Sequence, residues 1–125
     1  MKEQVLIIDD DEMMRLTILA VLEAFEFNVF SAQDGFSGLQ LAKEIYPDLI
    51  LCDLNMPFLN GFEVLKIIRN NLTTVKTPFI FLTADTDPKN RVQAMQLGAN
   101  DYLTKPFDIN ELLDSISHQF NWQGR

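Results

Sequence analysis

The sequence predicts an α/β fold, namely a doubly wound five-stranded parallel sheet made of five successive strand–helix units, (βα)5. Two observations predict it. Five short apolar runs alternate with longer segments whose apolar residues recur every three or four positions. Two of the runs, 5–8 and 49–52, are apolar at every position, which is typical of strands covered by helices on both faces. Helical crossovers between successive strands then make the sheet parallel.

The strands are predicted from the apolar runs. They lie at 5–8, 28–30, 49–52 and 79–82, with a weaker fifth strand at 102–103. The first, third and fifth helices are predicted from apolar residues at helical spacing, which form one apolar face. These residues are Met14, Ile18, Val21, Leu22 and Phe25 in the first helix, Phe62, Leu65, Ile68 and Leu72 in the third, and Ile109, Leu112, Leu113, Ile116 and Phe120 in the fifth.

The second and fourth helices are predicted from residues at their ends. The second helix, 36–45, stops before Pro47. Asp87 and Pro88, a capping acid followed by proline at the first helical position, begin the fourth helix. Gly98 ends that helix as a C-terminal cap.

Two further acids are predicted to begin helices. Asp108, with Glu111 three residues later, opens the last helix as a capping box. We interpret Asp11 as an acid at the start of the first helix, where it interacts with the macrodipole, rather than as a direct metal ligand. Gly61 is interpreted as a backbone requirement of the loop after the third strand.

Length and composition indicate one domain. We expect residues 1–120 to form it and 121–125, with Trp122, to be a tail or the start of a linker. Hydrophobic residues make up 47% and charged residues 22% of the chain, which argues against disorder. The net charge of −8 disfavours contact of this domain with nucleic acid or anionic membranes, because the summed field repels both.

Cysteine and histidine are each present once. The single cysteine, Cys52, excludes an internal disulfide and a multi-cysteine zinc site, and we expect it to be a packing residue rather than a redox group. His118 is interpreted as a solvated side chain rather than a phosphotransfer histidine. We expect a cytoplasmic location, because the N-terminus does not resemble a signal peptide and no apolar run approaches the roughly 18 residues of a membrane span.

Acidic residues follow two of the predicted strands. In open parallel sheets, ligands bind beyond the carboxyl ends of the strands. If the first and third strands are neighbours, Asp9, Asp10 and Asp53 meet at that edge, and their mutual repulsion requires a cation. One divalent cation and Lys105 would balance the three charges. The all-oxygen ligands favour Mg²⁺, with Mn²⁺ and Ca²⁺ as weaker candidates.

Such a cluster also has the groups needed for phosphoryl transfer. A carboxylate beside Mg²⁺ can attack a phosphoryl group and form an aspartyl phosphate. The metal, the ammonium of Lys105 and the hydroxyl of Thr83 would share the charge of the transition state. No glycine-rich phosphate loop is found in the sequence, so nucleotide binding has little support.

The residues singled out above for the cation and for phosphoryl transfer lie in four segments, 5–11, 53–61, 81–84 and 98–107. Taken in order, these segments resemble the receiver domain of two-component response regulators, which has the CheY-like (flavodoxin-like) fold. The resemblance covers essentially the whole chain and implies the strand order 2-1-3-4-5.

The resemblance also implies roles for the residues at the acidic edge. Asp53 would be the phosphoacceptor, and would ligate Mg²⁺ together with the Asp10 carboxylate and the backbone carbonyl of Asn55. Asp9 would act mainly through a metal-bound water. Lys105 would pair with the phosphoryl group, and its bond to Pro106 would be cis.

Four residues would control signalling and hydrolysis in this family. Thr83 and Tyr102 would be the conformational pair that reshapes the surface of the fourth helix, fifth strand and fifth helix, although Tyr102 as a static core aromatic stays an alternative. Asn55 and Asp85 would tune hydrolysis of the phosphoryl group.

The resemblance implies a phosphoacceptor that is not a turnover enzyme, although it catalyses its own phosphorylation and slow dephosphorylation. A sensor histidine kinase or a histidine phosphotransfer protein would supply the phosphoryl group, and a downstream protein or effector domain would receive the signal. We expect a monomer, or a weak dimer through the same helix–strand–helix surface.

Three rival interpretations remain. A pseudo-receiver would signal without phosphate. A haloacid-dehalogenase-type phosphohydrolase would need D-x-D-x-[TV] where this chain has 9–13, Asp-Asp-Asp-Glu-Met. A flavin-binding module would need a phosphate-cradling loop after the first strand, where acids stand instead.

Overall fold

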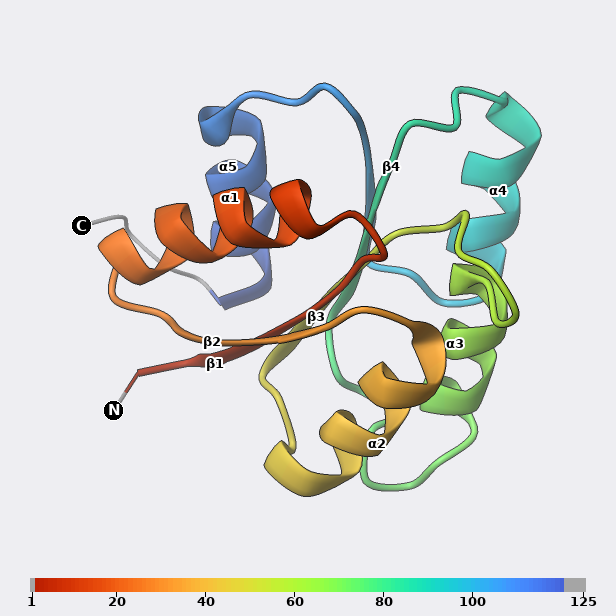
Figure 1. Ribbon diagram of the computed structural model, residues 1–125. Helices are drawn as coiled ribbons and strands as arrows, with labels where there is room; N and C mark the ends of the chain where they lie inside the picture. The colour runs from red at the N-terminus through yellow and green to blue at the C-terminus, as the bar shows by residue number, and fades with distance from the viewer. Residues whose placement is uncertain (1, 121–125) are drawn as a thin grey trace.

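The computed structural model of the protein, which describes residues 2–120, consists of alternating strands and helices (Figure 1). In order these are β1 (Gln4–Ile8), α1 (Glu12–Ala24), β2 (Asn28–Ala32), α2 (Gly35–Ile45), β3 (Leu49–Cys52), α3 (Gly61–Arg69), β4 (Phe79–Thr83), α4 (Pro88–Gln96), β5 (Asp101–Thr104) and α5 (Ile109–Phe120). The predicted tail, 121–125 with Trp122, lies outside the described residues.

The described residues form one five-stranded parallel sheet with the order β2-β1-β3-β4-β5, which confirms the predicted fold class. The register fixes which loops meet. Ile8 pairs with Cys52, so the residues that follow β1 and β3 leave the sheet side by side. Thr83 pairs with Thr104, which places the end of β4 beside the residue before Lys105.

Helices cover both faces of the sheet, as the fully apolar strands require (Figure 1). Leu6 and Ile8 of β1 point into the core under α2, α3 and α4, whereas Val5 and Ile7 point into the core under α1 and α5. The two cores are therefore separated by the sheet and share its strands.

The predicted helix ends are confirmed. Asp87 accepts a hydrogen bond from the Lys89 N–H at 3.0 Å as the N-cap of α4, and Gly98 follows α4 with a φ of 101°, a value that favours glycine. Asp108 and Glu111 form both hydrogen bonds of a capping box. Asp11 is the N-cap of α1.

Two positions of the predicted apolar faces are wrong. Helix α3 ends at Arg69, so Leu72 lies beyond it and is 94% exposed. The side chain of Asn71 accepts hydrogen bonds from Thr73 and starts a turn there. The i, i+4 spacing of apolar residues continues past this turn, and it therefore placed Leu72 wrongly on the helix. Ile109 belongs to α5 but is 51% exposed, because it stands at the first turn of the helix. No helix within residues 2–120 is long and apolar enough to cross a membrane.

Candidate functional site

Three carboxyl groups meet at the carboxyl edge of the sheet. Asp9 and Asp10 follow β1, and Asp53 follows β3. Each offers a carboxylate oxygen that lies within 4.8 Å of the other two. Because β1 and β3 pair in register, two acidic segments far apart in the chain leave the sheet together. The predicted convergence of the three acids is confirmed.

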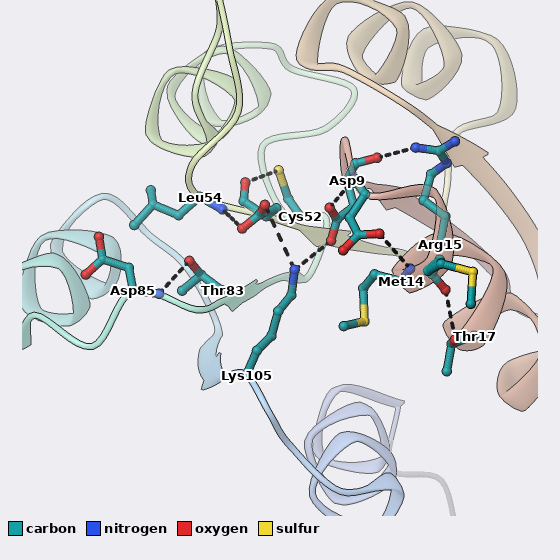
Figure 2. Close-up of polar contacts among 12 residues, drawn as sticks. Asp9, Met14, Arg15, Thr17, Cys52, Leu54, Thr83, Asp85 and Lys105 are labelled. Carbon is teal, nitrogen blue, oxygen red and sulfur yellow. Dashed lines mark hydrogen bonds and ion pairs between the residues drawn. The ribbon is translucent and has the colours of Figure 1, made fainter.

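The ammonium of Lys105 points into this cluster. Its Nζ lies 2.8 Å from Asp9 Oδ2 and 3.9 Å from Asp53 Oδ2. The Lys105 backbone N–H donates to the Thr83 carbonyl at 2.7 Å, which fixes where the side chain leaves β5. The bond from Lys105 to Pro106 is cis, as expected. Figure 2 shows Lys105 reaching between Asp9 on one side and Thr83 and Asp85 on the other.

Asp53 is a buried carboxyl group. It is 9% exposed, and its Oδ1 accepts one hydrogen bond from the Leu54 N–H at 2.8 Å. Burial raises the pKa of Asp53 to about 6; Lys105 lowers it and the charge of Asp9 raises it further. The residues present therefore compensate the buried negative charge only in part.

The backbone of the loop after β3 is tied closely to Asp53. The Gly61 N–H donates to the Leu54 carbonyl at 2.8 Å. A Cβ at Gly61 would lie 2.4 Å from the Asp53 carbonyl oxygen and 2.7 Å from the ring of Phe81, so no side chain fits there. This confirms that the loop requires glycine at position 61. The requirement comes from the close approach of the Asp53 carbonyl and the Phe81 ring and not from unusual backbone angles. Asn60 begins α3 with a capping box.

The donor set fits a hard divalent cation. Three carboxylates and one ammonium leave two uncompensated negative charges. One Mg²⁺ ion would neutralise them. Asp10 is exposed, and one of its carboxylate oxygens lies within 4.8 Å of an oxygen of Asp53, so these two carboxylates could hold the ion. The oxygens of Asp9 already accept from Lys105 and from the Asp11 N–H at 2.9 Å, which agrees with an indirect part for Asp9.

The remaining predicted residues form a second group beside the acids. Thr83 is fully buried, and its Oγ1 accepts a hydrogen bond from the Asp85 N–H at 3.1 Å. The buried ring of Tyr102 lies 6.0 Å from that of Phe81, and its hydroxyl donates to the Asp85 carbonyl at 3.1 Å. The Asn55 amide donates to Asp85 Oδ2 at 3.3 Å. Asp85 thus contacts Thr83, Tyr102 and Asn55.

The sequence alone did not indicate two polar residues near the site. Asn90, on the first turn of α4, donates to Asp85 Oδ2 at 2.7 Å. Arg15, on α1, donates to the Asp9 carbonyl at 2.8 Å. Both residues lie within about one turn of the start of a helix that follows a strand of the acidic edge. A polar side chain at such a position is the signal that could have pointed to them.

Cys52 and His118 have no part in this cluster of charges. The Cys52 thiol is buried, and burial raises its pKa well above the ordinary value, so it remains protonated as a packing group. His118 is exposed on α5, where its Nδ1 lies 2.7 Å from the Asp114 carbonyl oxygen.

The sequence model of the response regulator receiver domain matches residues 5–117. The chain belongs to the response regulator receiver family. The family thus confirms the resemblance and the flavodoxin-like, CheY-like fold.

Relatives and solved structures agree with this membership. The receiver domain is 40% identical over 113 residues to the DNA-binding dual master transcriptional regulator RpaA of Synechocystis, covering 90% of this chain and 47% of that protein. It is 39% identical over 113 residues to the cell cycle response regulator CtrA of Brucella ovis, covering 90% and 48%. The chain therefore spans about half the length of these curated relatives.

The structural neighbours match nearly the full chain. The chemotaxis protein CheY4 of Vibrio cholerae has a TM-score of 0.90 at 31% identity, covering 94% of this chain and 98% of that one. A response regulator receiver domain protein from Clostridium thermocellum has a TM-score of 0.89 at 30% identity, covering 95% and 94%.

Proposed function

We propose that this receiver domain accepts a phosphoryl group on Asp53 in a reaction that depends on Mg²⁺. The observation that carries the proposal is the cluster of three acids with Lys105 at 2.8 Å from Asp9 and 3.9 Å from Asp53. A sensor histidine kinase or a histidine phosphotransfer protein supplies the phosphoryl group. The domain then signals through a downstream protein or effector domain. The similarity to relatives that are named as regulators supports this output.

In the transfer step, a carboxylate oxygen of Asp53 forms a bond to phosphorus while the phosphorus–nitrogen bond of the donor histidine breaks. The electron pair of that bond remains on the imidazole. Mg²⁺, when bound by Asp10, Asp53 and the Asn55 carbonyl, supplies positive charge that stabilises the phosphoryl oxygens. Lys105 lies close enough to move from Asp9 toward a phosphoryl oxygen, and Thr83 supplies a hydroxyl donor at the end of β4.

Phosphorylation changes the charge at Asp53 and adds acceptor oxygens. Thr83 moves toward one of these oxygens, and the Tyr102 ring follows into the space that Thr83 vacates. The surface formed by α4, β5 and α5 changes with them, which biases an equilibrium between two states. The domain is a monomer or a weak dimer that forms through this same surface.

The domain acts in the cytoplasm and is a phosphoacceptor with slow self-dephosphorylation rather than a turnover enzyme. Its charge of −8 supports an output through protein contacts, with no direct binding of this domain to nucleic acid or membrane.

The test uses the purified chain with phosphoramidate, a small phosphodonor, and Mg²⁺. Intact mass is expected to rise by one phosphoryl group and to return as the acyl phosphate hydrolyses. Asp53→Asn should take up nothing, and EDTA should abolish uptake by the natural chain. Absence of uptake would favour the pseudo-receiver, and continuous phosphate release from a phosphatase substrate would favour the phosphohydrolase.

A further inference from the structure

Asp85 joins the site to α4 through its backbone and through its side chain. Its N–H donates to Thr83 Oγ1 and its carbonyl accepts from the Tyr102 hydroxyl, both at 3.1 Å. One residue therefore contacts both members of the proposed conformational pair. Its side chain leaves this backbone toward the loop after β3 and toward the first turn of α4.

The carboxylate of Asp85 is held from three sides. Oδ2 accepts from the Asn90 amide at 2.7 Å and from the Asn55 amide at 3.3 Å. Oδ1 accepts from the Asp87 N–H at 2.9 Å. The Asn90 contact is the shortest, whereas the contact with Asn55, two residues from Asp53, is the longest. Asn90 is thus the side chain best placed to keep the Asp85 carboxylate beside Asn55.

We propose that Asn90 is a positioning residue that sets the lifetime of the phosphoryl group by holding the Asp85 carboxylate next to the site. This rests on the proposed phosphorylation of Asp53. In hydrolysis a water oxygen bonds to phosphorus, the bond from phosphorus to the Asp53 oxygen breaks, and its electron pair stays on the carboxylate. The protons of the water remain on the released phosphate. A fixed carboxylate orients that water, and a free one does not.

The position of α4 affects the hydrolysis rate through the hydrogen bond between Asn90 and Asp85. Asn90 stands on α4, whereas Asp85 precedes the helix, so a displacement of the first turn of α4 lengthens or breaks the 2.7 Å hydrogen bond. Movement of the signalling surface and stability of the phosphorylated state are then coupled through one side-chain pair.

The experiment compares Asn90→Ala and Asn90→Asp with the matched control Gln93→Ala, which removes an exposed amide from the same helix. Each protein is loaded with phosphoramidate and Mg²⁺, the donor is removed, and decay is followed by intact mass. We expect Asn90→Ala to lengthen the half-life about threefold, in line with the loss of one hydrogen bond. Gln93→Ala should decay like the natural chain.

The isosteric Asn90→Asp distinguishes positioning from packing. It preserves shape, and an acid in the first turn of a helix is favourable for folding, so thermal stability should be retained. Its carboxylate repels Asp85, so the half-life should lengthen at least as much as in Asn90→Ala. In an Asp85→Ala background, Asn90→Ala should have no further effect.

The outcomes separate the two proposals. Decay of Asn90→Ala at the natural rate, faster decay, or an undiminished effect in the Asp85→Ala background would each overturn the role of Asn90 while leaving phosphorylation of Asp53 intact. Failure of the natural chain to take up a phosphoryl group from phosphoramidate would overturn the proposed function itself.

Discussion

Helices α3 and α4 have the same length, nine residues, and cover the same face of the sheet, yet they are held in different ways. In α3 four residues are buried: Gly61, Val64, Leu65 and Ile68. Among the nine described residues of α4, Ala94 alone is buried. Apolar burial is the larger source of stability, so α3 is fixed by the core and α4 is not.

Polar contacts fix α4 instead. Arg91 donates to the Tyr102 carbonyl at 2.8 Å, and its guanidinium lies 5.7 Å from the centre of the Tyr102 ring. Arg69, the last residue of α3, donates to the carbonyl of Gly98 just beyond α4 at 2.9 and 3.1 Å. Hydrogen bonds of this kind can be replaced one at a time by hydrogen bonds to water. The buried apolar face of α3, in contrast, can leave the core only as a whole. The comparison explains how α4 can move while α3 and Asp53 remain in place.

The largest expected effect comes from truncating one apolar residue in each helix. Leu65→Ala in α3 should lower the free energy of unfolding by about 2–5 kcal/mol, because it leaves a cavity in the core. Val92→Ala in α4 should change it by less than about 0.5 kcal/mol, because Val92 is 56% exposed. Urea unfolding measures both, and a loss in Val92→Ala close to that in Leu65→Ala would refute the contrast.

A smaller effect is expected at Asp53, where the rigid part of the molecule contains a buried charge. Folding raises the pKa of Asp53 from 3.8 to about 6, so the folded state binds this proton more tightly than the unfolded state. In metal-free protein, stability should therefore fall as pH rises through this range. Above about pH 6, Asp53→Asn should be more stable than the natural chain by about 1–2 kcal/mol, after allowance for solvent screening.

The control for Asp53 is the same pair of proteins near pH 4, where the difference should largely disappear because the carboxyl group is protonated. Mg²⁺ should raise the melting temperature of the natural chain more than that of Asp53→Asn. Equal pH dependence of the two proteins in EDTA would contradict the pKa assigned to Asp53.

The smallest effect concerns the loop that leads into α3. Phe58 is 92% exposed with a φ of 70°, and the Leu59 N–H donates across it to the Pro57 carbonyl at 2.8 Å. A side chain that buries little and adopts the left-handed region destabilises the folded state. Phe58→Gly should raise stability by about 0.5–1 kcal/mol, measured by urea unfolding. Phe58→Ala retains the Cβ and should give a smaller gain.

Much of the fold and of the acidic site follows from the sequence, because both depend on local patterns. Apolar runs predict buried strands, and the ends of parallel strands share one edge, so acids that follow neighbouring strands meet there. Asp9, Asp10 and Asp53 were found in this way, on the condition that β1 and β3 are neighbours, and Lys105 was added as the cation that balances part of their charge. The roles assigned to them stay predictions.

Other features could not be predicted from the apolar spacing, because spacing shows neither where a helix ends nor which polar side chains meet. Leu72 continues the spacing of α3 beyond the end of that helix, and spacing alone does not mark where a turn takes over. The contact of Arg69 with Gly98 joins residues 29 positions apart. The hydrogen bond from Asn90 to Asp85 depends on the orientation of α4, which local spacing does not determine.

Gly61 has a consequence for protein engineering. Its Cα faces the Asp53 carbonyl and the Phe81 ring with no room for a methyl group. A chimaera that receives the segment around Asp53 must therefore receive Gly61 with it. A library that randomises this loop for new specificities should leave Gly61 unchanged, since a side chain at 61 would displace the backbone that carries the carboxylate.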